Sequence, residues 1–162
     1  MRIAPVIVAG LLAFCSVGAA AEPMAVQSPT PRGTRAEAVA MVRLVQKRFQ
    51  KDGAKKTFAA ISDKSTKEFH QGDLYPFVFT FSGTCVAHGA RPALIGKNLI
   101  GLKDPDGRFL IRDMAARVQK GDGWYNYKWP TPTTNVIEDK SSFYSKLGTK
   151  YFVGVGVYRS TK

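Results

Sequence analysis

The sequence predicts an α+β fold in which a long N-terminal helix packs on an antiparallel sheet of about five strands. Three observations lead to this prediction. Apolar residues near position 42 recur at steps of three and four, as in an amphipathic helix. Aromatic residues near position 78 alternate with the period of a strand, and further strand-like segments fill the C-terminal part. This order is typical of a sheet with helices over one face.

The N-terminus has the pattern of a secretory signal peptide over residues 1–21. Arg2 precedes an apolar stretch over residues 3–17, and small residues occupy positions 18–21. This stretch is shorter than the roughly 20 residues that a membrane span needs. We therefore expect cleavage after residue 21 and a periplasmic location. A lipoprotein signal at Cys15 is the weaker alternative, because bulky Phe14 precedes the cysteine.

The remainder has the size of one domain. Residues 22–33 carry three prolines and predict a flexible leader, and residues 34–162 are expected to form a single domain. Only Cys85 remains after cleavage, so no disulfide can form within the domain. The formal net charge of +12 is spread along the chain, which more often serves solubility than a polyanion site.

The long helix is predicted to begin at Thr34. Thr34 is placed to cap its start, and Glu37 three residues later completes a capping box. Apolar side chains then follow at steps of four and three as far as Phe49. Gly53 ends or breaks the helix, and a short helical piece follows it.

A hairpin, a second helix and three more strands follow. Aromatic side chains alternate along residues 74–81, and Ser82 with Gly83 turns the chain into a returning strand at 84–88. After a loop region, Pro105 is expected to begin the second helix behind Asp104. The last three predicted strands cover residues 124–129, 140–146 and 151–158.

Several short motifs occur in a fixed order along the domain. They are Asp73-Leu74-Tyr75-Pro76-Phe77-Val78, Ala87-His88-Gly89, Gly123-Trp124-Tyr125, Trp129-Pro130, Lys140-Ser141-Ser142-Phe143-Tyr144 and Phe152-Val153-Gly154-Val155-Gly156-Val157-Tyr158. This series resembles the single-Cache type 2 family of PAS-like extracytoplasmic sensor domains, over residues 35–158. The resemblance implies a pocket over the sheet that takes small ligands, often short organic acids. Family members in receptors signal through flanking membrane helices, whereas here we expect no membrane span after the signal peptide and no output domain.

Two neighbouring strands supply most of the candidate ligand-binding residues. They are Tyr125, Tyr127 and Trp129 on the first strand, and Lys140, Ser142 and Tyr144 on the second. If both sets face the same side of the sheet, they line one pocket with aromatic walls, hydroxyls and an ammonium group, which suits a carboxylate. The alternative is that the aromatic residues are plain core and that Lys140 is a solvated charge.

The segment after the hairpin adds three candidates. His88 and Asn98 would either donate to a ligand carboxylate or form hydrogen bonds that hold the loop. Arg91 would bind an anion through two N–H groups if it points inward, and is otherwise surface. Gly154 and Gly156 share one face of the last strand and indicate a close approach, for which the N-terminal helix is the simplest explanation.

An enzyme is not expected. Cys85 and His88 lie three positions apart, which on a regular strand places them on opposite faces. The chain contains no Cys-x-x-Cys, His-Glu-x-x-His or Gly-x-Ser-x-Gly motif. Residues 104–107 lack the rest of a calcium loop. We therefore expect no catalytic residue, no metal site and no cofactor.

Two functions follow from the sequence. The first is a periplasmic sensor-type module that binds a small anionic metabolite and serves a membrane receptor or another periplasmic protein, without binding nucleic acid. The second is an envelope protein whose basic surface binds an anionic partner, polymer or lipid. A homodimer through the long helix is compatible with both.

Overall fold

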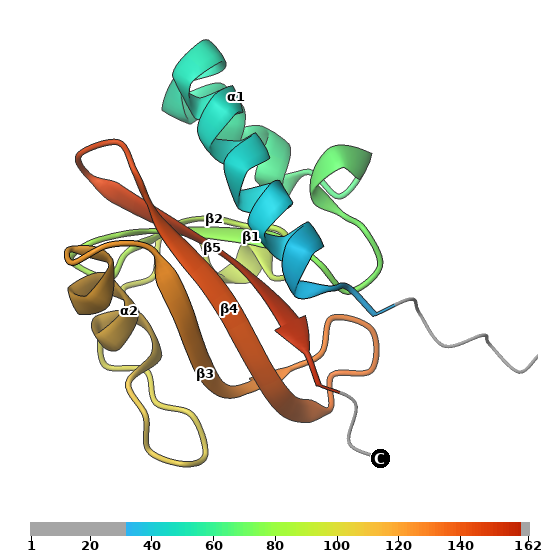
Figure 1. Cartoon of the computed structure of the whole chain (residues 1–162), viewed down its shortest axis with the longest axis vertical. Coiled ribbons are helices and arrows are strands. Elements are labelled where there is room, and N and C mark those ends of the chain that lie inside the picture. The colour runs from blue at the N-terminus through green and yellow to red at the C-terminus, as the bar shows by residue number, and fades with distance from the viewer. Residues whose placement is uncertain (1–31, 160–162) are drawn as a thin grey trace, which may run out of the picture.

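The computed structural model describes residues 32–159 (Figure 1). The predicted signal peptide and most of the predicted leader lie outside these residues. The elements, in chain order, are α1 (Arg35–Ser62), η1 (Lys67–Phe69), β1 (Pro76–Thr80), β2 (Cys85–His88), η2 (Pro92–Leu94), α2 (Leu110–Val118), β3 (Gly123–Pro130), β4 (Ile137–Leu147) and β5 (Tyr151–Tyr158).

The five strands form one antiparallel sheet in the order β2-β1-β5-β4-β3. The last strand in the chain, β5, therefore lies at the centre, between the hairpin β1–β2 and the hairpin β3–β4. The predicted α+β fold, with its long N-terminal helix on a five-stranded antiparallel sheet, is confirmed.

Helix α1 begins and bends where the sequence indicates. The Thr34 side chain accepts a hydrogen bond from the Glu37 backbone N–H, and the Glu37 side chain accepts one from the Thr34 backbone N–H. Gly53 has a φ of 76°, outside the helical range, and it bends the helix there. Within the described residues, no helix is both long and apolar enough to cross a membrane.

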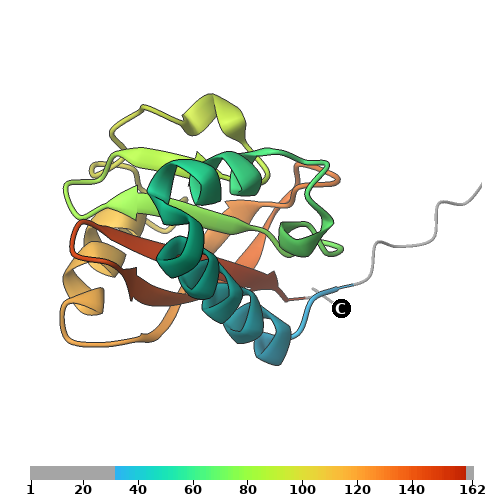
Figure 2. The same cartoon turned by 90° about the horizontal axis from the view of Figure 1, so that it is seen from above.

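Helices cover both faces of the sheet, which corrects the expectation that they lie over one face (Figure 2). Helix α1 packs on the valines of β5, among them Val153 and Val155, and these residues form one core cluster. Helix α2 packs against the opposite face, where Phe77 of β1 and Tyr127 of β3 belong to a second cluster. The sheet thus separates two apolar layers, and the second layer holds the pocket.

Helix α2 begins at Leu110, five residues later than the predicted start at Pro105. The Asp104 carboxylate accepts hydrogen bonds from the backbone N–H groups of Asp106 and Arg108, which closes a turn instead of capping a helix. The turn ends at Gly107, whose φ of 80° is left-handed. Local hydrogen bonding of the aspartate therefore explains the delay.

Candidate functional site

The two strands that were expected to line a pocket present their side chains to the same side of the sheet. In the antiparallel register, Tyr125 lies opposite Ser142, and Tyr127 lies opposite Lys140. Tyr125 and Tyr127 belong to the core cluster of α2. Both sets of side chains therefore face the same side of the sheet, as a shared pocket requires. This is the face opposite α1.

A narrow cavity of about 20 Å³ lies between this face, α2 and the loop that precedes α2. Four of the predicted residues line it, namely His88, Tyr127, Trp129 and Lys140. The remaining lining residues are Tyr75, Phe77, Phe79, Leu94, Leu99, Leu102, Leu110, Ile111 and Met114. The walls are thus apolar and aromatic, with a few polar groups gathered at one place, which is the usual composition of a small-molecule site.

Lys140 is the central polar group of this cavity. Its side chain is buried, with only 2% of the residue exposed. The Nζ donates hydrogen bonds to the hydroxyls of Tyr75, at 2.7 Å, and Tyr158, at 3.2 Å. It also lies 4.0 Å and 4.6 Å from the ring centroids of the same two tyrosines. The alternative of a solvated surface charge is therefore wrong for Lys140.

Burial lowers the pKa of Lys140 well below 10.5, because the ammonium form loses its hydration. The carboxylate of Asp73 acts in the opposite direction, and Arg91 adds to the lowering. Among residues 32–159, no carboxylate oxygen lies within 4.0 Å of the Lys140 Nζ. The amine is thus held by neutral phenols, without a counter-charge in contact.

His88 lies beside this amine and is neutral. Its Nδ1 accepts a hydrogen bond of 3.0 Å from the Arg91 backbone N–H, which leaves the ring proton on Nε2. The imidazole packs on the rings of Tyr75 and Phe77. Burial, with smaller contributions from Lys140 and Arg91, lowers the pKa of His88 to about 3. The histidine therefore offers one N–H donor at neutral pH.

Cys85 and His88 lie on the same face of β2, contrary to the expectation from their spacing. His88 pairs with Phe77 and Cys85 with Phe79, so an irregularity in β2 shifts the register by one residue. Burial raises the pKa of the Cys85 thiol to about 11, so the sulfur is held as the thiol. Among the described residues, no group of three or more histidine, cysteine or acidic side chains is arranged to hold a metal.

Three predicted residues of β3 and β4 are buried on the pocket face without lining the cavity. The Tyr125 hydroxyl donates to the Asp113 carboxylate of α2 at 2.9 Å. Ser142 forms a hydrogen bond of 2.9 Å with the Tyr127 hydroxyl and so positions a lining residue. Tyr144 belongs to the apolar cluster around α2. These side chains pack around the residues that line the cavity and do not line it themselves.

The two predicted residues after the hairpin also lie outside the cavity lining. Arg91 donates to the Asn135 side chain and lies over the Trp129 ring, 5.8 Å from its centroid. Asn98 donates to the Ser82 carbonyl at 3.0 Å and accepts from the Ile100 backbone N–H. Of its two predicted roles, it therefore has the one of holding the loop by hydrogen bonds. The loop that Asn98 holds carries apolar residues of the cavity wall.

The glycines of β5 face the pocket and not α1, which corrects the simplest explanation given for them. A Cβ at Gly154 would lie 2.2 Å from the Phe77 ring. A Cβ at Gly156 would lie 2.2 Å from the Lys140 Cε and 2.3 Å from the Ser142 Oγ. The missing side chains therefore make room for a wall residue and for the central amine.

Tyr75 and Tyr158 are polar groups of the site that the sequence reasoning missed. The sequence held a signal for Tyr75, because it is the first aromatic residue of the alternating segment that contains β1. Tyr158 ends β5, and its hydroxyl lies 3.0 Å from that of Tyr75 and donates to the Pro130 carbonyl at 2.9 Å. Nothing local in the sequence marks this tyrosine, since its role depends on how β5 and β4 pair.

Known proteins resemble this chain in sequence. Sensor histidine kinase MctS of Rhizobium johnstonii is 36% identical over 108 residues, which cover 66% of this chain and 23% of the kinase. Methyl-accepting chemotaxis protein McpP of Pseudomonas putida is 30% identical over 88 residues, or 53% of this chain and 16% of the receptor. The aligned regions thus span less than a quarter of either relative.

Solved structures resemble it in fold. A methyl-accepting chemotaxis protein from Vibrio parahaemolyticus superimposes with a TM-score of 0.63 at 29% identity, covering 76% of this chain and 84% of that one. A Cache chemosensory domain studied for carboxylic acid recognition has a TM-score of 0.57 at 24% identity, with 77% and 88% coverage. A family model for the Cache domain matches residues 35–161. This chain therefore belongs to the Cache domain family of sensory modules.

Proposed function

We propose that this domain binds a small carboxylate in the cavity and that the Lys140 amine is its main anion partner. The observation that carries the proposal is that the buried Lys140 amine donates to two tyrosine hydroxyls and, among residues 32–159, contacts no carboxylate. A buried ammonium is costly unless it is paired. A carboxylate that displaces the phenol contacts would supply the missing charge.

Two further hydrogen-bond donors line the same cavity as the Lys140 amine. His88 and Tyr127 line the cavity together with Lys140, and the neutral imidazole keeps its N–H. Charge-assisted hydrogen bonds from such donors are the strong ones in an apolar surrounding. The arrangement supports an acid group held at the polar end and a hydrocarbon part against the leucine wall.

The ligand is expected to be small. A cavity of about 20 Å³ has room for about one water molecule, so any organic acid must displace part of the wall. The part of the wall that we propose to move comprises Leu94, at the end of η2, and Leu99 and Leu102, in the loop before α2, because none of them belongs to the sheet. Short acids require the smallest displacement, and they agree with the carboxylic acid recognition for which one Cache chemosensory domain was studied.

The bound state is proposed to serve a partner protein in the periplasm or a membrane receptor. The support is the kind of protein that the relatives are, a sensor histidine kinase and a chemotaxis receptor. In such proteins a small ligand changes the balance between states of a larger assembly.

Calorimetric titration with matched pairs of acid and amide, such as propionate and propionamide, tests the proposal. The acid is expected to bind with saturation and the amide to bind at least about tenfold more weakly, since only the acid supplies a charge. Lys140→Met should abolish acid binding. Lys128→Met, the same change at an exposed lysine that is paired with Asp106 at 2.9 Å, should leave it unchanged.

Equal binding of acid and amide, or equal loss in both variants, would refute the assignment of Lys140. Absence of any saturable binding across short monocarboxylates, dicarboxylates and amino acids would refute the carboxylate pocket itself.

A further inference from the structure

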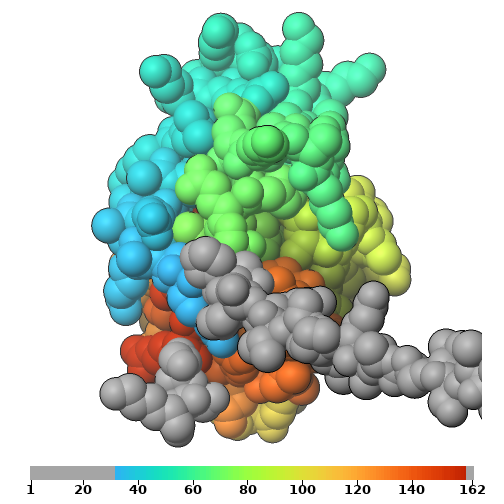
Figure 3. Space-filling model, turned by 90° about the vertical axis from the view of Figure 1, so that its right-hand side faces the viewer, coloured from blue at the N-terminus to red at the C-terminus, as the bar shows by residue number. Residues whose placement is uncertain are grey.

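One end of the molecule is rich in lysine. Residues 47–56 of α1 and residues 146–150 of the β4–β5 hairpin together hold seven basic side chains and one acidic side chain. Six of the seven are exposed lysines, which we call the lysine end: Lys47, Lys51, Lys55, Lys56, Lys146 and Lys150. Figure 3 shows side chains from the later part of α1 projecting from this end of the molecule.

The two segments of the lysine end are neighbours in space. The Gln46 side chain on α1 donates to the Lys146 backbone carbonyl at 2.9 Å. The Phe49 and Phe58 rings lie 6.2 Å and 5.1 Å from the Tyr151 ring, so the kinked part of α1 packs against the hairpin. The lysines therefore belong to one surface and not to two separate ones.

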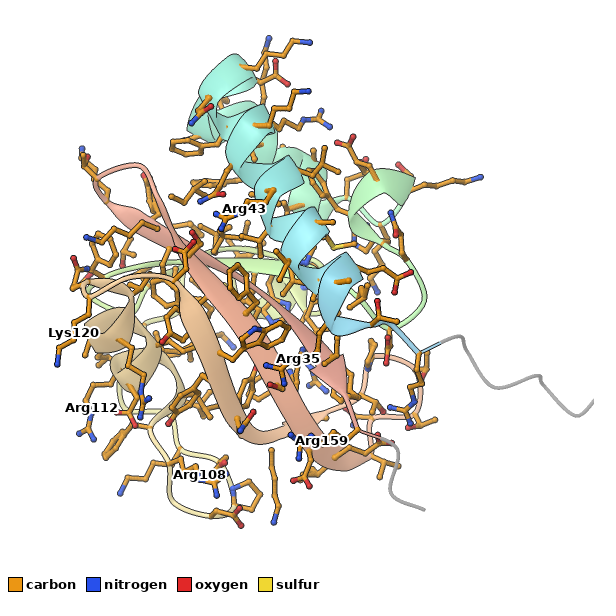
Figure 4. The ribbon with its side chains drawn as sticks, in the orientation of Figure 1. Arg35, Arg43, Arg108, Arg112, Lys120 and Arg159 are labelled. Carbon is orange, nitrogen blue, oxygen red and sulfur yellow. The ribbon has the colours of Figure 1, made fainter. Side chains whose placement is uncertain are left out.

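Within the part of the chain that the structure describes, the six lysines of the lysine end are not paired with acidic side chains, whereas several other basic residues are. Arg43 pairs with Asp122 at 2.9 Å and Arg112 with Asp113 at 3.4 Å, and Figure 4 labels both arginines. The single acid of the lysine end, Asp52, pairs with Arg48 at 3.4 Å. Among the ion pairs of residues 32–159, which reach to 4.0 Å, none includes one of the six lysines.

We infer that the lysine end binds the surface of an anionic lipid bilayer. Clusters of four to eight basic residues bind anionic headgroups, and each lysine or arginine contributes roughly 1 kcal/mol to the attraction. All six exposed basic residues at the lysine end are lysine, whose compact charge on a flexible stem suits mobile headgroups. Arginine, with its planar fork, is the residue favoured for nucleic-acid recognition.

This surface is independent of the cavity. The cavity lies on the face of the sheet opposite α1, whereas the lysine end lies on α1 and at the tip of the hairpin. Contact with a bilayer would therefore leave the carboxylate pocket open. The two proposals can fail separately, since one concerns small acids and the other concerns vesicles.

Vesicle sedimentation with the chain purified without its predicted signal peptide, residues 1–21, tests the inference. Neutral phosphatidylcholine vesicles are compared with vesicles that contain phosphatidylglycerol, at low and high salt. The wild type should bind only the anionic vesicles, and salt should weaken this binding, because exposed charges are screened. Changing all six lysines to glutamine should weaken the binding by about tenfold or more.

The matched control changes six exposed basic residues elsewhere to glutamine: Lys97, Lys103, Arg112, Arg117, Lys120 and Arg159. It has the same net charge as the first variant and should retain binding within about threefold, because charges more than a Debye length from the bilayer are screened. A second pair of variants, with only Lys146 and Lys150 changed or only the four helical lysines changed, should give intermediate losses. Circular dichroism and urea denaturation verify that each variant is folded.

Three outcomes would overturn the inference. The first is failure of anionic vesicles to retain the wild type at low salt. The second is equal loss of binding in both six-residue variants, which would assign the effect to net charge. The third is binding of heparin or DNA to the lysine end as tightly as anionic vesicles bind it, which would assign the surface to polyanions in general.

Discussion

Replacing Lys140 by methionine is expected to stabilise the ligand-free domain while it removes carboxylate binding. The two effects have opposite signs because the same amine is costly to bury and useful to a ligand. Methionine fills a similar volume with no charge, so the substitution isolates the amine.

The magnitude follows from the protonation of the amine. In the unfolded chain at pH 7 the lysine is charged, because its ordinary pKa is 10.5. The folded domain can release that proton, so burial costs at most about 5 kcal/mol, which corresponds to the interval between pH 7 and 10.5. The hydrogen bonds to Tyr75 and Tyr158 return about 1 kcal/mol each. We expect Lys140→Met to raise the free energy of unfolding by about 1–3 kcal/mol.

Urea denaturation at pH 7, monitored by circular dichroism, measures this change. Lys128→Met is the control, and its effect should stay within about 0.5 kcal/mol because an exposed ion pair contributes little. A Lys140→Met domain that is less stable than the wild type by more than about 1 kcal/mol would contradict the reasoning. It would mean that the amine contributes more to packing and hydrogen bonding than burial costs.

Three further predictions concern other groups around the cavity. Because the folded pKa of His88 is about 3 and its ordinary value 6.5, only the unfolded state takes up this proton between those values. The unfolding free energy should therefore fall by up to about 1.4 kcal/mol per unit as pH drops from 6.5 to 3, and His88→Gln should flatten this slope in denaturation curves. Gly156→Ala, whose Cβ would lie 2.2 Å from the Lys140 Cε, should cost about 1–3 kcal/mol and weaken acid binding at least about tenfold, whereas Gly101→Ala, with nothing within 4 Å, should do neither. Cys85 should react with a thiol reagent only as fast as the domain unfolds, because burial raises its pKa to about 11; rapid labelling of the native protein would refute this.

Local patterns in the sequence predicted the elements well. The capping box at Thr34, the break at Gly53 and the alternation along β1 each depend on residues within one turn or one strand. Such signals can be read without knowledge of the tertiary structure. The family resemblance added the pocket, and the pairing of β3 with β4 met the geometric condition for it.

What the sequence did not predict depends on pairing between distant segments. One shift of register in β2 turns Cys85 to the same face as His88. The residues near this shift carry no sequence pattern that predicts it. The side on which Gly154 and Gly156 lie is likewise set by the register of β5 with its neighbours. Tyr158 joins the site for the same reason.

The carboxylate of Asp73 links the start of the folded domain to the cavity. It accepts a hydrogen bond of 2.7 Å from the Gly33 backbone N–H and lies 3.8 Å from Arg32, just before α1. The same charge raises the pKa of Lys140. Linkage is reciprocal, so a positive charge at Lys140 lowers the pKa of the Asp73 carboxyl. An acid bound to Lys140 would oppose this effect, and it would thereby alter the protonation of the group that contacts the residues just before α1.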